Sequence, residues 1–189
     1  MMIEIRKTTI EDIEGIVKVN TKVWQSAYSG IIHKHTLDAL KNSLEERIQR
    51  FQDEYIEAEA SNKPLYQAVA VEDGNVIGFI KYGDYRNDDI FTFDRAAEVY
   101  AIYVDDTYQR KQVGKRLINF ALVHMLELGR YESMVIWTLK ENTFRTFYES
   151  IGGKAELSRT ISIRDQRLEE VGYKFDSLND SEKGTRYEN

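Results

Sequence analysis

The chain has 189 residues, no cysteine and a formal net charge of −6 at pH 7. This length fits one domain with a sizeable core, and the lack of cysteine excludes disulfides, thiolate metal ligands and a cysteine acyl-enzyme. The negative charge argues against a nucleic-acid partner, which needs a concentrated basic face. No apolar run approaches the ~20 residues that cross a bilayer, and residues 1–6 lack the apolar segment of a signal peptide. We therefore expect a cytoplasmic protein without a membrane partner.

The first half of the chain predicts a strand, two helices and a hairpin, in that order. Residues 3–5 alternate as a short strand does, and an apolar stripe over residues 13–28 has helical spacing. A second helix follows the capping pattern of Ser43 and Glu46. Two strands, over residues 66–71 and 76–82, are then joined through Asp73 and Gly74, which is a good hairpin signal.

The most informative stretch is the loop over residues 109–114. It follows a β-branched and aromatic strand over residues 99–104 and precedes an amphipathic helix that ends near Gly129. The first turn of this helix presents unpaired N–H groups and the positive end of the helix dipole. Four cationic side chains lie around that end, an arrangement that suits a pyrophosphate: Arg110, Lys111, Lys115 and Arg116.

The last third of the chain predicts a strand and a short helix over residues 137–153, followed by strands over about 155–163 and 169–175. Residues 179–189 are polar and are expected to form a mobile tail, so the domain would cover residues 1–178. This order of elements predicts a single α/β (α+β) domain, in which helices cover both faces of a mixed sheet.

Two segments in order resemble the GCN5-related N-acetyltransferases. Residues 109–114 resemble that family's Q/R-x-x-G-x-G/A loop, with Gln112 in place of the first glycine. Gln112 would reach a left-handed backbone less easily than glycine does. The second segment joins Asn142 to the sequence Phe147-Tyr148-Glu149, which resembles the family's cofactor-contacting Asn and its "FYE" helix.

The resemblance implies a mostly antiparallel sheet of six to seven strands, splayed between the fourth and fifth strands to form a cofactor slot. Acetyl-CoA would lie with its pantetheine arm along the backbone of Ile102, Tyr103 and Val104. An N–H near Val104 would stabilise the oxyanion. Other cofactor contacts would come from Asn142, Tyr148 and the loop, namely Gln109, Arg110, Lys111, Gln112, Val113, Gly114 and Lys115.

The resemblance also implies roles that each have a plain structural alternative. Tyr148 would contact the thiol or act as a general acid, or it is ordinary core packing. Glu98 would be the base, or it is a solvated acid at a strand end. The acceptor would meet Trp24, Tyr28 and Tyr100, although Trp24 and Tyr28 could equally be the core face of their helix.

We therefore expect direct acetyl transfer from acetyl-CoA to a primary amine of a small molecule or peptide, by a monomer or homodimer. The alternative is a non-catalytic acyl-CoA-binding sensor or regulatory module. A nucleotide hydrolase is disfavoured because the loop has no Gly-Lys-Ser/Thr sequence. Five acids before and at the cofactor strand would favour a cationic acceptor, or they merely solubilise a loop: Asp84, Asp88, Asp89, Asp94 and Glu98.

No metal site is expected. His33 and His35 are two residues apart, and no third residue at an obvious ligand spacing accompanies them. They are expected to lie in a surface loop.

Overall fold

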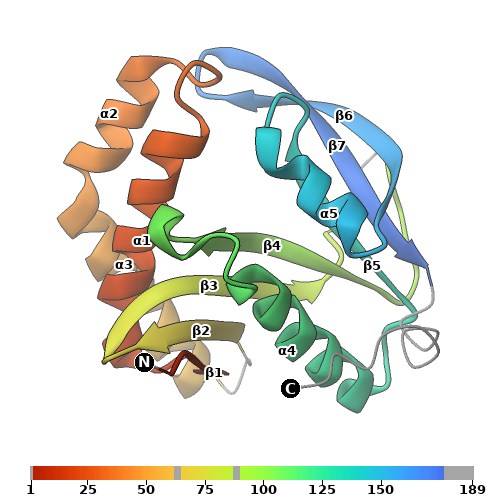
Figure 1. Cartoon of the computed structure of the whole chain (residues 1–189), viewed down its shortest axis with the longest axis horizontal. Coiled ribbons are helices and arrows are strands. Elements are labelled where there is room, and N and C mark those ends of the chain that lie inside the picture. The colour runs from red at the N-terminus through yellow and green to blue at the C-terminus, as the bar shows by residue number, and fades with distance from the viewer. Residues whose placement is uncertain (1, 62–64, 87–89, 177–189) are drawn as a thin grey trace.

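The computed structural model describes residues 2–61, 65–86 and 90–176. In these residues one mixed sheet has the strand order β1-β2-β3-β4-β5-β7-β6, and every neighbouring pair is antiparallel except β4 and β5 (Figure 1). The strands are β1 (Glu4–Lys7), β2 (Tyr66–Glu72), β3 (Asn75–Asp84), β4 (Ala96–Val104), β5 (Ser133–Leu139), β6 (Lys154–Ile163) and β7 (Gln166–Asp176). The expected fold class is confirmed. Asp88, Asp89 and the tail expected over 179–189 lie outside the described residues.

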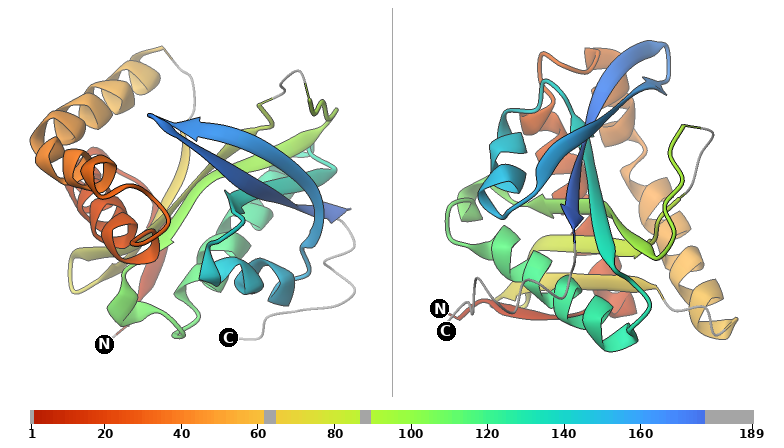
Figure 2. Two further views of the ribbon diagram at one scale, coloured as in Figure 1. Left: turned by 90° about the horizontal axis from the view of Figure 1, so that it is seen from above. Right: turned by 90° about the vertical axis from the view of Figure 1, so that its right-hand side faces the viewer.

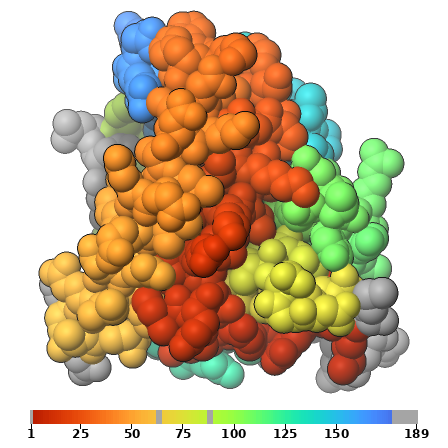
Figure 3. Space-filling model, turned by 90° about the vertical axis from the view of Figure 1, so that its left-hand side faces the viewer, coloured from red at the N-terminus to blue at the C-terminus, as the bar shows by residue number. Residues whose placement is uncertain are grey.

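Helices cover both faces of the sheet, as Figures 1 and 2 show. The helices are α1 (Ile13–Ala27), α2 (Lys34–Asn42), α3 (Leu44–Ala60), α4 (Val113–Leu128) and α5 (Thr146–Ser150), with short 3-10 turns η1 (Ile10–Asp12), η2 (Asp106–Tyr108) and η3 (Thr143–Arg145). The first three helices form one layer, whose outer surface is seen in Figure 3. No helix in the described part of the chain is long and apolar enough to cross a membrane.

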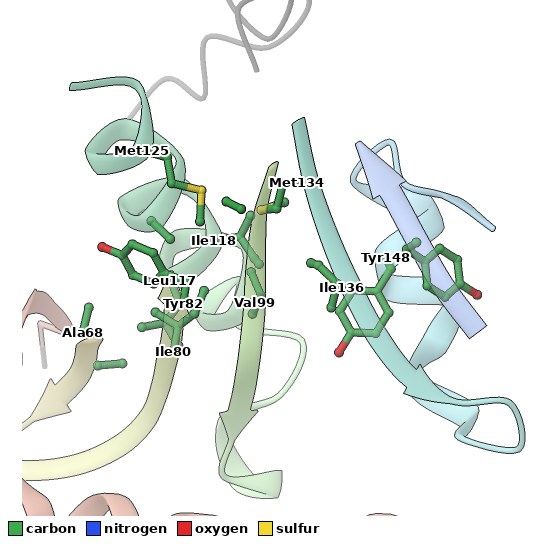
Figure 4. Packing of buried hydrophobic residues seen from close by; sticks show 14 of the residues in the cluster. Ala68, Ile80, Tyr82, Val99, Leu117, Ile118, Met125, Met134, Ile136 and Tyr148 are labelled. Carbon is green, nitrogen blue, oxygen red and sulfur yellow. The ribbon is translucent and has the colours of Figure 1, made fainter. Parts of the chain in front are cut away.

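The main core lies between α4 and the sheet (Figure 4). Leu117, Ala121 and Met125 repeat at helical spacing on α4 and are fully buried against strand residues such as Ile80 and Met134. A second core lies on the opposite face, where α1 buries Ile13, Ile16 and Val17 against β2 and β3. Both faces of the central strands are therefore apolar, which explains their nearly continuous hydrophobic sequences.

The splay between β4 and β5 is present. The two strands pair in parallel over only four residue pairs, and Val99 with Ile136 is the last of them. Beyond that pair β4 continues to Val104 beside β3, while β5 continues to Leu139 beside β7. The two strands separate toward their carboxyl ends, as Figure 4 shows.

Local expectations held at two turns. Asp73 and Gly74 both have positive φ in the β2–β3 turn, as a tight hairpin requires. Gly129 ends α4 in a left-handed conformation, with its N–H bonded to the carbonyl of Leu126.

Two expectations were wrong. Ser43 makes no side-chain bond to the start of α3, because its hydroxyl donates instead to the carbonyl of Ala39 in the preceding helix. The segment expected as a loop around His35 is the helix α2, a short element of nine residues that buries only Thr36 and Leu37.

Candidate functional site

A cavity of about 750 Å³ lies at the splay and joins the loop before α4 to the opposite side of the sheet. Its volume is in the range of small-molecule sites. The sequence-predicted residues that line it are Tyr28, Tyr100, Ile102, Tyr103, Val104, Gln109, Arg110, Gln112, Val113, Gly114, Lys115, Asn142 and Tyr148. Lys111, Trp24 and Glu98 do not line it. Sequence reasoning did not assign Trp137, Thr138 or Phe147 to the site, although all three line the cavity.

The loop before α4 turns through two left-handed residues, Arg110 with φ 61° and Gln112 with φ 62°. Gln112 is the N-cap of α4, yet its side chain makes no capping bond, and the first turn contains no acidic residue. The N–H groups of this turn are thus available to an anion. A non-glycine residue in this backbone region carries strain of order 1 kcal/mol or more.

The Phe147 ring, across the cavity, limits the space for a side chain at position 114. A Cβ built on Gly114 would lie 3.3 Å from the Phe147 ring, so a side chain here would force that ring to shift by a few tenths of an ångström. The second glycine of the loop pattern is therefore retained where the two helices meet.

The four cations around the loop are not equivalent. Arg110 and Lys115 line the cavity. Arg116 is turned toward β1, where it donates to the carbonyl of Ile3 at 2.9 Å, and Lys111 lies over the ring of Tyr108 at 4.7 Å. The side chains able to meet a ligand inside the cavity are thus fewer than the sequence predicts.

The backbone of β4 offers an unpaired edge to the cavity. Asp105 donates its N–H to Ile77 on β3 at 2.9 Å. Because N–H groups alternate in direction along a strand, the N–H of Val104 points away from β3 and into the gap left by β5.

Tyr148 reaches from α5 toward this gap (Figure 4) and lines the cavity. Its ring is held between Tyr173 and Phe147, with ring centroids at 5.4 and 5.5 Å. Burial raises the pKa of the Tyr148 hydroxyl above its ordinary value, and the neighbouring hydroxyls of Tyr103 and Tyr173 add to the shift. Tyr148 therefore stays protonated through the neutral and mildly basic range.

Asn142 fixes the segment that carries Tyr148. Its side-chain oxygen accepts the N–H of Phe144 at 3.0 Å, and its amide nitrogen donates to Thr138 Oγ1 at 2.9 Å. Asn142 is thus the N-cap of η3, and it also lines the cavity.

On the face of the sheet opposite α4, aromatic hydroxyls gather around Tyr103. Trp24 donates from Nε1 to the Tyr103 hydroxyl at 2.9 Å. Burial and the nearby Tyr103 hydroxyl raise the pKa of Tyr28, and the Tyr28 ring meets Trp24 edge-on at 5.0 Å. Trp24 thus lies behind the cavity wall and holds the Tyr103 hydroxyl, whereas Tyr28 and Tyr103 are part of that wall.

Tyr100 lies at a β-bulge. Lys81 is opposite Ala101 and Tyr82 is opposite Val99, so Tyr100 is an extra residue on β4. Its hydroxyl donates to the carbonyl of Asp84, and the Arg86 guanidinium lies 4.5 Å from its ring centroid.

Glu98 does not fit the role of base that was expected for it. Its side chain is only 2% exposed, it does not line the cavity, and its two oxygens accept bonds from the backbone N–H and the guanidinium of Arg86. A carboxylate engaged by these donors has little capacity left to take a proton from an amine. Glu98 therefore anchors the connection before β4 to the strand.

Besides Arg86, Arg159 also packs on an aromatic ring of the cavity wall, that of Trp137. Arg159 lies 4.1 Å from the Trp137 ring centroid and donates from Nε to Glu170 at 2.8 Å. Trp137 Nε1 is buried and has no hydrogen-bond partner in the structure. No spacing in the sequence links these residues, because β5, β6 and β7 bring them together.

Comparison with known proteins agrees with this geometry. Residues 31–152 match the model of a family described as the acetyltransferase (GNAT) family. An uncharacterized N-acetyltransferase, YuaI of Bacillus subtilis, is 29% identical over 177 residues, which cover 94% of this chain and 95% of that protein.

A spermidine N(1)-acetyltransferase of Thermoplasma acidophilum is 27% identical over 156 residues, covering 82% of this chain and 91% of that protein. Among solved structures, the PaiA N-acetyltransferase of Thermoplasma acidophilum in complex with coenzyme A has a TM-score of 0.68 at 23% identity, covering 93% of this chain and 100% of that one.

Proposed function

The chain belongs to the acetyltransferase (GNAT) family, and we propose that its cavity brings acetyl-CoA together with a primary amine of a small molecule or peptide for direct transfer. The family gives the reaction class, with acetyl-CoA as the acyl donor. The observation that carries the residue assignments is that one cavity joins the uncapped start of α4, the unpaired edge of β4 and the hydroxyl of Tyr148.

The residues present fit acetyl-CoA. The N–H groups at the start of α4, with Arg110 and Lys115, would hold the pyrophosphate. The backbone of Ile102 to Val104 would pair with the pantetheine amides, because β5 leaves that edge of β4 unpaired. Gly114 keeps space open beside Phe147.

When bound, acetyl-CoA supplies an activated thioester carbonyl. The neutral amine nitrogen forms the new C–N bond, the C–S bond breaks, and the sulfur leaves as a thiolate. The N–H of Val104 would stabilise the charge that develops on the carbonyl oxygen.

Tyr148 would donate a hydrogen bond to the departing sulfur. Reference pKa values of about 10 for tyrosine and about 8.5 for a thiol already make full proton transfer uphill by roughly 2 kcal/mol. Burial raises the pKa of Tyr148 further, which disfavours full transfer still more. We therefore assign Tyr148 to charge stabilisation.

The amine must also lose a proton when the new C–N bond forms. The described residues that line the cavity include no carboxylate and no histidine. The acceptor would therefore react as the free amine, and solvent would take the proton released on transfer.

The acceptor class rests on two observations. One relative is named as a spermidine N(1)-acetyltransferase, which favours an aliphatic amine. The acids expected to attract a cation are partly neutralised, since Glu98 is paired with Arg86, and Asp84 accepts from Tyr131 and lies 3.4 Å from Arg130. We therefore expect acceptance of aliphatic amines in general, with a modest preference for polyamines. A cytoplasmic location and a monomeric or homodimeric state stay predictions.

The deciding experiment measures thiol release from acetyl-CoA with a panel of aliphatic amines, polyamines, arylamines and peptides. Amine-dependent release with a matching acetylated product supports the proposal. Tight acetyl-CoA binding without release for any amine would favour the sensor or regulatory module instead.

A further inference from the structure

Three side chains of metal-ligating type converge at the surface where α2 begins. His33 is the N-cap of α2, His35 lies in its first turn, and Asp165 lies in the turn between β6 and β7. Figure 1 shows this turn beside the start of α2, and Figure 3 shows the same contact at the surface. One ligand atom from each residue lies within 4.8 Å of the other two.

The two segments are docked by contacts that do not involve these side chains. Gln166 donates from Nε2 to the carbonyl of Ile31 at 2.7 Å and accepts the N–H of His33 at 2.9 Å. Beneath them, Ile32 and Leu37 pack with residues of β6 and β7, including Leu168. The protein itself therefore brings the three side chains together, which lowers the entropic cost of forming a site.

The spacing suits a small divalent ion. His35 Nε2 lies 3.1 Å from one oxygen of Asp165, and His33 Nδ1 lies 3.6 Å from the other. Ligand atoms at the usual Zn–N and Zn–O lengths are separated by about 3.4 Å in a tetrahedral site. All three ligand atoms lie within 4.8 Å of one another, so rotation of these exposed side chains would bring them to that spacing.

The donor set also selects among metals. Two imidazoles and one carboxylate suit Zn²⁺, Co²⁺ or Ni²⁺, whereas Mg²⁺ and Ca²⁺ prefer oxygen ligands alone. The side chains of His33, His35 and Asp165 are 49%, 59% and 59% exposed, so water can occupy a fourth position.

We propose that His33, His35 and Asp165 bind one Zn²⁺-class ion, which ties the β6–β7 turn to the start of α2. The plain alternative is a pair of exposed His–Asp contacts without an ion, which would contribute little to stability. Tyr28 packs in the same apolar cluster as Ile32 and Leu37 and lines the cavity, so the ion would stiffen the wall on the proposed acceptor side. Ion binding itself does not depend on the proposed function.

The test uses the full chain without a histidine tag, freed of metal by a chelator. Calorimetric titration with Zn²⁺ should give one ion per chain, and Mg²⁺ should give no binding. Co²⁺ should produce the visible absorption of a tetrahedral or five-coordinate imidazole complex. Zn²⁺ should raise the unfolding temperature, because it binds only the folded arrangement.

Variants decide whether these residues are the ligands. His35→Ala and Asp165→Asn each remove one of three ligands. Loss of a residue that only hydrogen-bonds a metal ligand lowers metal affinity by roughly 10–100-fold. Loss of a ligand itself should lower the affinity for Zn²⁺ by more than that. The matched controls are His124→Gln on α4 and Asp38→Asn on α2, which should bind Zn²⁺ as the parent does. Absence of binding in the parent chain, or binding that His35→Ala and Asp165→Asn leave unchanged, would overturn the proposal.

Discussion

Arg86 encloses the carboxylate of Glu98. Its backbone N–H and its Nε lie 3.0 and 3.2 Å from the same oxygen, and its terminal nitrogen bonds to the other. The same guanidinium lies over Tyr100, the extra residue of the β4 bulge. This pair therefore fixes the connection before β4 against the strand, close to the point where β4 leaves β5.

This arrangement predicts that Glu98→Gln acts on stability and not on proton transfer. A buried carboxylate that loses its charge leaves Arg86 with a weaker acceptor, so the free energy of unfolding should fall by roughly 1–3 kcal/mol. The rise of kcat/KM with pH should keep its shape. Asp94→Asn, at an exposed acid of the same connection, is the control and should change neither quantity. A flattened pH profile in Glu98→Gln would restore Glu98 as the base.

The pH dependence of the reaction should belong to the acceptor. Since no described residue lining the cavity is a carboxylate or a histidine, kcat/KM should rise as the free amine forms and level off near the pKa of that amine. Burial raises the pKa of Tyr148 above the usual value of about 10. Its hydroxyl is therefore protonated throughout, and no loss of rate is expected up to about pH 10. The check is a pair of acceptors with different amine pKa values, whose profiles should be displaced by that difference. Coincident profiles would point to a protein group.

Tyr148→Phe keeps the ring and removes the hydroxyl. Affinity for acetyl-CoA should be unchanged, while kcat should fall by roughly 10–1000-fold through loss of one hydrogen bond to developing charge. Tyr173→Phe is the matched control, because that hydroxyl binds Glu149 at 2.9 Å and does not line the cavity. Binding by calorimetry and steady-state rates separate the two effects. An unchanged kcat in Tyr148→Phe would reduce Tyr148 to a packing residue.

Much of this site could be predicted from local sequence. Two parts of it can be recognised in the sequence, the loop over residues 109–114 and the residue Asn142. Backbone turns and helix starts require particular residues within a few positions. The splay between β4 and β5 follows from the resemblance, whereas nothing in either strand's own residues marks Val99 and Ile136 as the last pair before it.

Other features depend on contacts between distant segments. The bulge at Tyr100 changes which face its neighbours occupy, and no local residue marks it. Arg86 meets Glu98 across a connection whose path the sequence does not specify. Asp165 approaches His35 only because β6 and β7 return the chain to α2 after 130 residues, so a search for ligand spacing could not find it.

Gln112→Gly should relieve the left-handed backbone at the start of α4. Glycine adopts φ near 62° without a Cβ penalty, so stability should rise by up to about 1 kcal/mol, and acetyl-CoA should bind at least as tightly. Gln109→Gly is the matched control, because its φ of −65° and ψ of 155° suit any residue. There glycine adds freedom to the unfolded chain and removes the bond from Gln109 Nε2 to Asp106 Oδ1, so it should destabilise by at least roughly 0.5–1 kcal/mol. Denaturation midpoints that move in the same direction for both variants would contradict strain at Gln112.

Replacing Arg110 and Lys115 by alanine should weaken acetyl-CoA binding with little loss of stability, because both side chains line the cavity beside the uncapped start of α4. The contacts are exposed to solvent, so the difference from the parent should shrink as salt rises. Arg116→Ala removes one positive charge, half of what the double variant removes, from a side chain next to Lys115 in sequence that is turned to the carbonyl of Ile3. It should therefore cost much less affinity than the double variant. Calorimetry at low and high salt measures both effects. Equal losses in Arg116→Ala and in the double variant would mean that the loop acts through general charge, whereas an unchanged affinity in the double variant would place the pyrophosphate elsewhere.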